Sequence, residues 1–459
     1  MIHRYQKKGL NFVLDVNSGA VHLLDDISYA VSGLLDENMG DTCPQSIIDA
    51  LPDYTADEIR EAYDELYELK KAGQLFAQDD YIDVSRYIPV NAPVKALCLH
   101  VAHDCNLRCK YCFASTGDFG QGRKIMPPEI AKKAIDFVIA RSGVRHNIEV
   151  DFFGGEPLMA WDTVTQTVDY ARSLEEKYNK KFRFTITTNG LLLDEDKRKY
   201  INENMDNCVL SLDGRREVND EFRKTVAGTG SYDTIVPKFK ALVDERDPNL
   251  DYYARGTFTS HNLDFAEDVL SIADAGFDRL SVEPVTADPG CGYDLTEDDL
   301  PKIEAEYDRL TDIMLERKKE GKPFTFFHFM VDLDQGPCVV KRLRGCGAGY
   351  EYVAVTPDGD IYPCHQFVGK DEFKQGSVLD QSFNMDIAQT FAGMNIYSRP
   401  KCQKCWAKFY CSGGCSAANY NMNHDMNDSY DLGCEMERKR LECAIYLKAM
   451  DKICANQSK

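Results

Sequence analysis

The chain of 459 residues is long enough for two or three domains, and its 43% hydrophobic content allows a large buried core. Its formal net charge of −21 and pI of about 4.9 argue against nucleic acid as a partner, because phosphates demand a basic surface. No signal peptide follows the first residues and no apolar run approaches membrane-spanning length, so we expect a cytoplasmic protein with no membrane partner. In that reducing compartment the 17 cysteines predict metal binding rather than disulfides.

Short strand and helix patterns alternate over residues 1–78. We expect strands over 2–5, 11–16 and 20–24, helices over 27–35, 44–51 and 55–70, and a final turn and strand over 72–76. This order fits a winged helix–turn–helix, but the acidic last helix disfavours DNA binding. Residues 79–93, rich in Asp and Pro, are predicted to be a linker.

Residues 1–78 resemble the peptide-recognition element of enzymes that modify ribosomally made peptides. The resemblance implies that an extended leader peptide adds a strand beside residues 20–24 and packs on residues 62–69. The alternative is a stabilising N-terminal cap with no ligand.

Residues 94–330 alternate between apolar runs and amphipathic patterns. Strands are predicted at residues 94–101, 147–153, 182–187, 208–212, 252–258 and 279–282. Alternating βα units imply a parallel sheet with right-handed crossovers. Two further helices are expected over 297–319 and 324–331.

A C-x3-C-x2-C motif, Cys105, Cys109 and Cys112, follows the first of these strands. Three thiolates so close together must curl around a shared centre, and thiolates suit iron–sulfur clusters or zinc. A tetrahedral zinc site needs four ligands, whereas three cysteines on a [4Fe–4S] cluster leave one iron open. A zinc knot or three unrelated core cysteines is the alternative.

With Tyr111 before the third cysteine, the motif resembles that of radical S-adenosylmethionine (SAM) enzymes. The resemblance implies an α/β fold with a partial (β/α)6 TIM barrel, and a cluster that cleaves SAM to a 5′-deoxyadenosyl radical. It also implies SAM-binding roles for these residues at strand ends: Gly154, Gly155, Glu156, Thr188, Asn189, Ser211 and Asp213. Arg223 either pairs with the SAM carboxylate or is a solvated surface charge, and Glu283 either faces the substrate or is a structural partner.

Seven later cysteines resemble those of the SPASM domain, which we predict over residues 331–440 before a helix over 441–459. The resemblance implies two auxiliary [4Fe–4S] clusters, one held by Cys346, Cys364 and Cys415, the other by Cys402, Cys405, Cys411 and Cys434. The first cluster lacks one ligand, which is either Cys338 or a cysteine of the substrate, and we favour the substrate. C-x2-C spacings serve zinc equally well, so zinc is the alternative.

Together these parts resemble the SCIFF maturases, whose substrates carry six cysteines in forty-five residues. The sequence of residues 14–22 supports that subgroup. The resemblance implies an oxidoreductase that links a cysteine sulfur to a carbon, with threonine as the expected acceptor. The partner would be a cysteine-rich precursor peptide with a leader, matured to a sactipeptide or ranthipeptide, and the electron donor reduced flavodoxin or ferredoxin. Alternatives are carbon–carbon crosslinking, epimerisation, formylglycine formation, or a zinc-binding peptide adaptor without catalysis.

Overall fold

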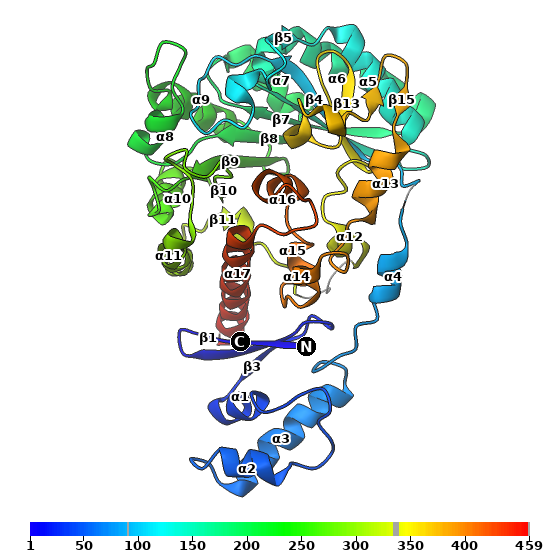
Figure 1. Ribbon diagram of the computed structural model, residues 1–459. Coiled ribbons are helices and arrows are strands. Elements are labelled where there is room, and N and C mark those ends of the chain that lie inside the picture. The colour runs from blue at the N-terminus through cyan, green and yellow to red at the C-terminus, as the bar shows by residue number, and fades with distance from the viewer. Residues whose placement is uncertain (90, 334–338, 458–459) are drawn as a thin grey trace.

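The computed structural model describes residues 1–89, 91–333 and 339–457. A large curved sheet with outer helices forms one end of the molecule, cysteine-rich segments lie below its open side, and the N-terminal unit is at the other end (Figure 1). None of the helices described is long and apolar enough to span a membrane.

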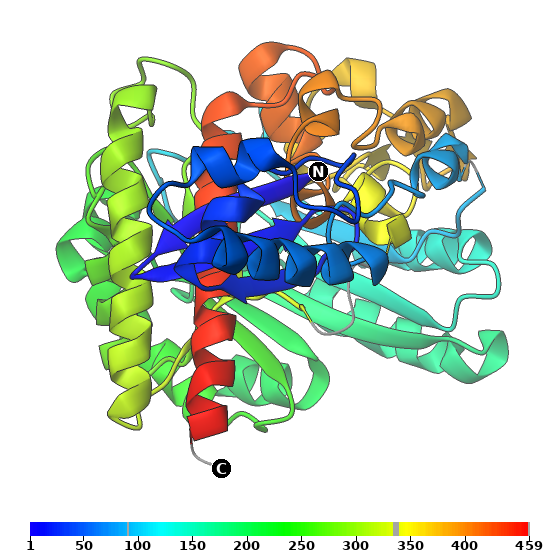
Figure 2. The same cartoon turned by 90° about the horizontal axis from the view of Figure 1, so that it is seen from below.

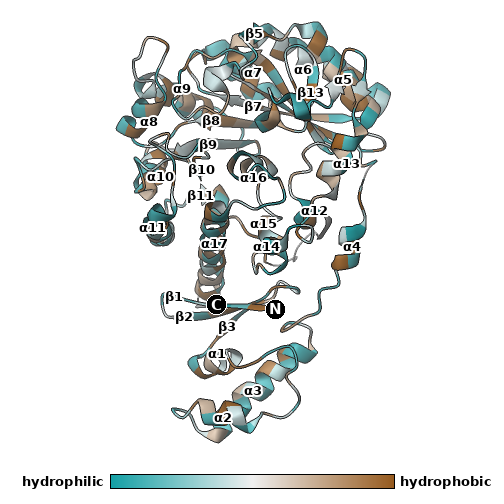
Figure 3. Ribbon diagram, viewed as in Figure 1, coloured by the Kyte–Doolittle hydropathy of each residue, from teal (hydrophilic) through white to brown (hydrophobic). Residues whose placement is uncertain are grey.

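The N-terminal unit is a three-stranded antiparallel sheet followed by three helices. Its elements are β1 (Ile2–Lys7), β2 (Leu10–Asp15), β3 (Val21–Leu24), α1 (Asp26–Ser32), α2 (Gln45–Ala50) and α3 (Ala56–Lys71). The predicted helix over 55–70 begins with a capping box, in which Thr55 and Glu58 bond reciprocally at the start of α3. Helix α3 mixes hydrophilic and hydrophobic residues, as expected with one buried face (Figure 3).

Of the turn and strand predicted over residues 72–76, the turn is confirmed and the strand is wrong. Gly73 adopts a φ of +69°, and the amide of Gln74 bonds back to Leu69, so this segment closes the end of α3 as a turn. The chain then passes through a short helix, α4 (Ile82–Arg86), to the large sheet.

The six predicted strands of the large sheet are confirmed, and they lie side by side in chain order and parallel. They are β4 (Ala96–His103), β6 (Asn147–Gly154), β7 (Lys181–Thr188), β8 (Asn207–Ser211), β9 (Asp251–Phe258) and β10 (Arg279–Pro284). Alternate residues such as Phe152, Phe184 and Ala254 are fully buried. Their neighbours along the strands, such as Phe153 and Arg255, lie on the other face.

Helices between the strands cover the outer face of the sheet (Figure 1). They are α5 (Pro128–Arg141), α6 (Trp161–Tyr178), α7 (Glu195–Asn204), α8 (Arg216–Phe222), α9 (Tyr232–Asp244) and α10 (Phe265–Asp274). Helix α11 (Leu300–Lys319) follows β10 and fits the helix predicted there.

The helix predicted over residues 324–331 is wrong. Thr325 and Phe326 form a strand, β11, which pairs in parallel with Arg279 and Leu280 of β10, and a single 3₁₀ turn, η4 (Phe327–Phe329), follows it. A short apolar run is ambiguous between strand and helix, and here pairing with the sheet edge decided it.

The C-terminal part extends the other edge of the sheet and then forms short helices. Strand β12 (Tyr352–Val355) runs parallel to β4, and a turn at residues 356–359 joins it to β13 (Asp360–Tyr362). The remaining elements are β14 (Gly376–Ser377), β15 (Ser382–Phe383), α12 (Val339–Arg344), α13 (Met385–Gly393), α14 (Pro400–Gln403), α15 (Lys408–Cys411), α16 (Ser416–Asn423) and α17 (Asp431–Gln457). The last helix thus begins well before the predicted residue 441.

The N-terminal sheet packs on the last helix. Tyr5, Phe12 and Leu14 form a buried cluster with Ile445 and Tyr446 of α17. Seen from below, the N-terminal unit lies across α17 (Figure 2). The first and last parts of the chain therefore share one apolar interface.

Candidate active site and cluster-binding cysteines

The C-x3-C-x2-C cysteines lie on the loop that leaves the C-terminal end of β4. The loop is held from outside by the segment after α8, since the amide of Arg108 donates to the carbonyl of Lys224 at 2.7 Å. Burial raises the pKa of Cys105 and of Cys109 to about 12, so both thiols stay protonated until a metal centre binds.

Glycines allow the end of β6 to lie directly against this loop. A Cβ on Gly154 would lie 2.2 Å from the Ala102 carbonyl oxygen, and one on Gly155 would lie 2.1 Å from that of Asp104. The backbone amide of Gly155 donates to Ala102 at 2.7 Å. The two glycines of the Gly-Gly-Glu-Pro motif are therefore required by the close approach of two backbones.

Glu156 is 1% exposed and joins two strand ends. Its carboxylate accepts from the Thr188 hydroxyl at 2.7 Å, the Asn189 amide at 2.8 Å and the Leu158 amide at 3.0 Å. Burial raises the pKa of Glu156 to about 7. Because a carboxylate offers about four acceptor positions, one position remains for a ligand ammonium group, whose charge would favour the ionised form.

Asn189 reaches the first cysteine as well. Its Nδ2 lies 3.5 Å from Cys105 Sγ and 2.8 Å from Asn106 Oδ1. The third strand end therefore contacts both Glu156 and the cysteine loop.

Asp213 gathers Tyr111 and Arg223 beside the cysteine loop. Its buried carboxylate accepts from the Tyr111 hydroxyl at 2.6 Å and from the Thr257 amide at 3.0 Å, and Arg223 Nε lies 3.0 Å from it. Arg223 is buried, so its reading as a solvated surface charge is wrong. Ser211, half-buried, ends the same strand two residues before Asp213.

His103 and Asp104, which precede the cysteine loop, have local partners. His103 Nε2 lies 3.2 Å from His100 Nδ1 in the interior. Asp104 accepts from the Cys105 amide at 2.8 Å and pairs with Arg123 at 2.7 Å. These contacts give both residues structural partners.

Cys364 lies close to Cys346 and Cys415. Burial is the main cause that raises the pKa of Cys364, and negative charge on Cys415 or Cys346 raises it further. Cys364 belongs to a buried cluster against which Cys112 and Phe153 also pack. This set therefore lies on the same side of the sheet as the first cysteine loop. Cys338, the candidate fourth ligand, is outside the described residues.

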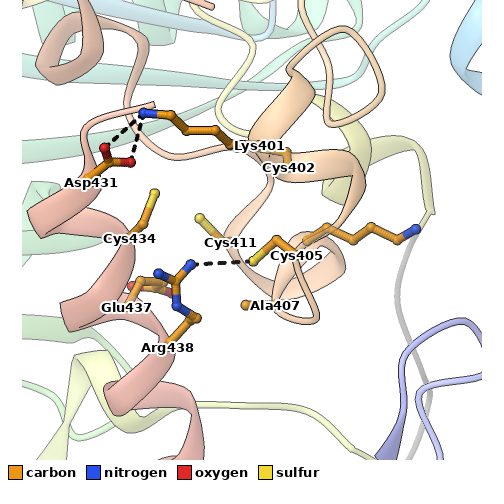
Figure 4. A pocket seen from close by; sticks show the side chains of 11 residues that line it. Lys401, Cys402, Cys405, Ala407, Cys411, Asp431, Cys434, Glu437 and Arg438 are labelled. Atoms are coloured by element: carbon orange, nitrogen blue, oxygen red, sulfur yellow. Dashed lines mark hydrogen bonds and ion pairs between the residues drawn. The ribbon is translucent and has the colours of Figure 1, made fainter. Parts of the chain in front are cut away.

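Cys402, Cys405, Cys411 and Cys434 line one cavity of about 310 Å³ between α14, α15 and α17 (Figure 4). Arg438 Nη1 lies 3.8 Å from Cys405 Sγ at its edge.

A single zinc ion would draw its sulfurs to within about 4 Å of one another, given Zn–S bonds of about 2.3 Å. Within residues 1–89, 91–333 and 339–457, no three His, Cys, Asp or Glu side chains could hold one ion. The four cysteines themselves are a ligand set that either a tetrahedral zinc ion or a [4Fe–4S] cluster uses.

Charged residues on the inner face of the sheet pair with one another. Arg255 of β9 pairs with Glu283 of β10, which keeps 33% of its side chain exposed. Burial would raise the pKa of Glu283, but the positive charges of Arg255, His328 and Arg440, with the Arg255 hydrogen bond, together outweigh it and lower the pKa. His328 Nε2 lies 3.8 Å from the same carboxylate. Glu283 is thus a paired group that remains accessible from the inner face.

Sequence reasoning missed Arg255 and His365. Arg255 had a usable signal, since a charged residue in an otherwise apolar strand needs a partner. His365 packs against the rings of both Phe113 and Phe153, with centroids 5.6 Å and 5.1 Å away, and only its position after Cys364 distinguished it.

Two parts of the chain match known families. Residues 99–251 match the radical SAM superfamily, and residues 346–406 match SPASM, an iron–sulfur cluster-binding domain.

Two curated relatives cover most of the chain. A cysteine-type anaerobic sulfatase-maturating enzyme of Clostridium novyi is 25% identical over 354 residues, which are 72% of this chain and 90% of the relative. The radical SAM cyclopropyl synthase TigE of Paramaledivibacter caminithermalis is 24% identical over 353 residues, which are 72% and 70% of the two chains.

Solved structures share the fold. The enzyme anSMEcpe with bound AdoMet gives a TM-score of 0.63 at 21% identity and covers 78% of this chain and 99% of its own. SuiB of Streptococcus suis bound to S-adenosylmethionine gives 0.52 at 17% identity, over 94% and 97% of the two chains. The sheet described above accordingly has the partial-barrel fold of these structures, and the chain contains a region of the radical SAM superfamily at residues 99–251 and a SPASM region at residues 346–406.

Proposed function

We propose that this enzyme forms a thioether between a cysteine sulfur and a carbon, with threonine as the expected acceptor, in a ribosomally made precursor peptide, as SCIFF maturases do. The observation that carries the proposal is the shared buried cluster of Cys364 with Cys112 and Phe153. Because this cluster places the cysteine loop near Cys364, a substrate bound beside it would reach both the SAM site and the first auxiliary site.

Solved structures of two similar proteins support a peptide substrate. SuiB has been solved with its precursor peptide SuiA, and anSMEcpe with the Kp18Cys peptide. The similar sulfatase-maturating enzymes favour a second candidate, oxidation of a substrate cysteine to formylglycine. The match of residues 346–406 to an iron–sulfur cluster-binding domain disfavours the zinc adaptor.

In this proposal Cys105, Cys109 and Cys112 hold one [4Fe–4S] cluster beside SAM, and together these groups supply the 5′-deoxyadenosyl radical that removes a hydrogen atom. Glu156 binds the SAM ammonium through its remaining acceptor position. Arg223, whose Nε is engaged by Asp213, uses its other nitrogens for the SAM carboxylate.

Other predicted SAM contacts have positioning roles in the proposal. Thr188 and Asn189 orient Glu156, and Asp213 orients Tyr111. The half-buried Ser211 offers its hydroxyl to the cofactor at the end of β8.

Two auxiliary [4Fe–4S] clusters complete the proposed site. Cys346, Cys364 and Cys415 would hold the first, with a substrate cysteine or Cys338 as the fourth ligand. Cys402, Cys405, Cys411 and Cys434 would hold the second in their cavity. Reduced flavodoxin or ferredoxin would supply electrons to the SAM cluster.

We assign leader binding to the N-terminal unit as a winged helix–turn–helix peptide-recognition element. Of the strands described, only β2 pairs with β3, so the other edge of β3 is free to accept an extended peptide. Ala62 and Leu66, within the predicted docking surface, are buried core, which leaves the acidic Asp64, Glu65 and Glu68 exposed. A leader with basic residues fits this surface.

Anaerobic incubation of the reconstituted enzyme with SAM, reductant and a cysteine-rich leader–core peptide tests the proposal. We expect a product that is two hydrogens lighter and contains a sulfur-to-carbon bond, located by tandem mass spectrometry. A cysteine converted to an aldehyde would support the formylglycine alternative, and an unmodified peptide would contradict both.

A further inference from the structure

Arg399 is a buried cation to which no Asp or Glu among the described residues is bonded. The residue is 3% exposed. Its Nη1 donates to the Gly413 carbonyl at 2.7 Å and its Nη2 to the Ser416 hydroxyl at 3.0 Å, while Nε is buried without a partner. Two neutral acceptors do not compensate a full charge withdrawn from water.

Cations that line the four-cysteine cavity differ from Arg399 in having carboxylate partners. Lys401 pairs with Asp431 at 2.8 Å, and Lys408 pairs with Asp79 at 2.8 Å. The unmatched charge of Arg399 therefore needs an anion that the polypeptide itself does not provide.

The guanidinium group lies on a segment that serves both auxiliary cysteine sets. Gly413 and Ser416 flank Cys415 of the first set and follow Cys411 of the second. A Cβ on Gly413 would lie 2.0 Å from Arg399 Nη1, so only glycine permits this approach. Burial lowers the pKa of Arg399, and negative charge on cysteines of both sets opposes that effect.

We propose that Arg399 is a positioning residue that places a fixed positive charge between the two auxiliary clusters and raises their reduction potentials. A [4Fe–4S]2+ core with four thiolates has a net charge of minus two, and reduction by one electron makes it more negative. A nearby buried cation stabilises the reduced state more than the oxidised state.

This inference rests on the proposed function, in which one electron must leave the substrate. When the thiolate bonds to the carbon radical, the product retains one surplus electron. Its transfer to an auxiliary cluster reduces that core from 2+ to 1+ and leaves a closed-shell thioether. The Arg399 charge favours this transfer.

The test is a redox titration, followed by electron paramagnetic resonance, of reconstituted wild type, Arg399→Gln and Arg399→Lys. We expect Arg399→Gln to shift the midpoint potentials of the auxiliary clusters to more negative values. Arg399→Lys should retain the wild-type potentials, because it keeps the positive charge. Arg246→Gln is the matched control, since Arg246 is a buried arginine bound by the carbonyls of Met205 and Asp251, and its loss should leave the potentials unchanged.

Iron content per chain is measured on every variant. Loss of auxiliary iron in Arg399→Gln that Arg399→Lys restores would also support a role of the charge. Unchanged potentials in fully loaded Arg399→Gln, or equal loss of iron in both variants, would overturn the inference. The auxiliary clusters of the wild type are therefore measured first, before those of any variant. Their absence would contradict both the proposed function and this inference.

Discussion

Asp213 is the residue on which the proposed SAM side of the site most depends, because Tyr111, Arg223 and the Thr257 amide all converge on its carboxylate. Asp213→Asn would leave Arg223 buried without its counter-charge. Breaking a buried pair in this way costs about 3–5 kcal/mol, so we expect the free energy of unfolding in urea to fall by that amount.

A matched control is Asp251→Asn, which breaks the more exposed pair with Arg279. Such surface pairs contribute about 1 kcal/mol or less. Equal losses in the two variants would contradict the assigned importance of Asp213.

Gly155→Ala tests the contact between β6 and the cysteine loop. The added methyl would meet the Asp104 carbonyl oxygen at 2.1 Å, which forces the loop away from Glu156. We expect SAM affinity, measured by equilibrium dialysis on the reconstituted enzyme, to fall at least about tenfold, or about 1.4 kcal/mol. Gly40→Ala, where nothing lies within 4 Å, is the control, and equal affinities in the two variants would refute the steric argument.

At this scale the sequence predicted residues held by local motifs better than residues held by distant partners. The Gly-Gly-Glu-Pro and cysteine motifs each lie on one short segment, and the structure brings them together. The sequence did not identify Arg399, because its role depends on Gly413 and Ser416, and no local sequence pattern connects these residues to it.

Among the elements, β3 carries a prediction of its own, because no strand within residues 1–89, 91–333 and 339–457 pairs with its outer edge and its Leu23 is 43% exposed. If a leader peptide adds a strand at this edge, Leu23→Asp should weaken its binding about tenfold or more by removing apolar contact and adding charge. Fluorescence anisotropy with a labelled leader peptide measures this.

The control for that variant is Val144→Asp, which alters another exposed apolar residue in the loop between α5 and β6. A Leu23→Asp enzyme that binds leader as tightly as Val144→Asp would place the docking surface elsewhere.

The parallel strands were predictable because each carries a continuous or alternating apolar pattern. The two-residue strand β11 was not, because its conformation depends on pairing with Arg279 and Leu280 rather than on its own residues. The turn at Gly73 similarly ended a segment whose composition favoured a strand.

In the molecule as a whole, the N-terminal sheet is held to the rest partly by Asp308 of α11. Lys7 of β1 and Lys439 of α17 both bond to this carboxylate. Burial would raise the pKa of Asp308, but the two ammonium groups outweigh it and lower the pKa. A depressed native pKa gives stability that is present above the unfolded value of about 4 and is lost as pH falls through the native pKa.

We therefore expect wild type to melt above Asp308→Asn at neutral pH, and the difference to vanish as pH falls below about 4. Thermal unfolding of both proteins across this range gives the comparison. A difference that persists unchanged in acid would show that the charge of Asp308 is not its cause.

No sequence pattern predicted that the N-terminal sheet packs on the last helix. Tyr5 and Tyr446 lie near opposite ends of the chain, and their contact follows no periodicity. The cysteine sets were predictable because thiolate ligation needs recognisable spacings, whereas the docking of one apolar face on another uses residues that any core contains.

The central claim is that the loop of Cys105, Cys109 and Cys112 holds a cluster with an iron position open to SAM. Its most direct test is 5′-deoxyadenosine formation by the anaerobically reconstituted, dithionite-reduced wild type and the variant with all three cysteines changed to alanine, with iron counted in each. We predict that the wild type forms 5′-deoxyadenosine, and that the variant forms none while it keeps its auxiliary iron. Continued 5′-deoxyadenosine formation by the variant, or none by a fully loaded wild type, would contradict the account.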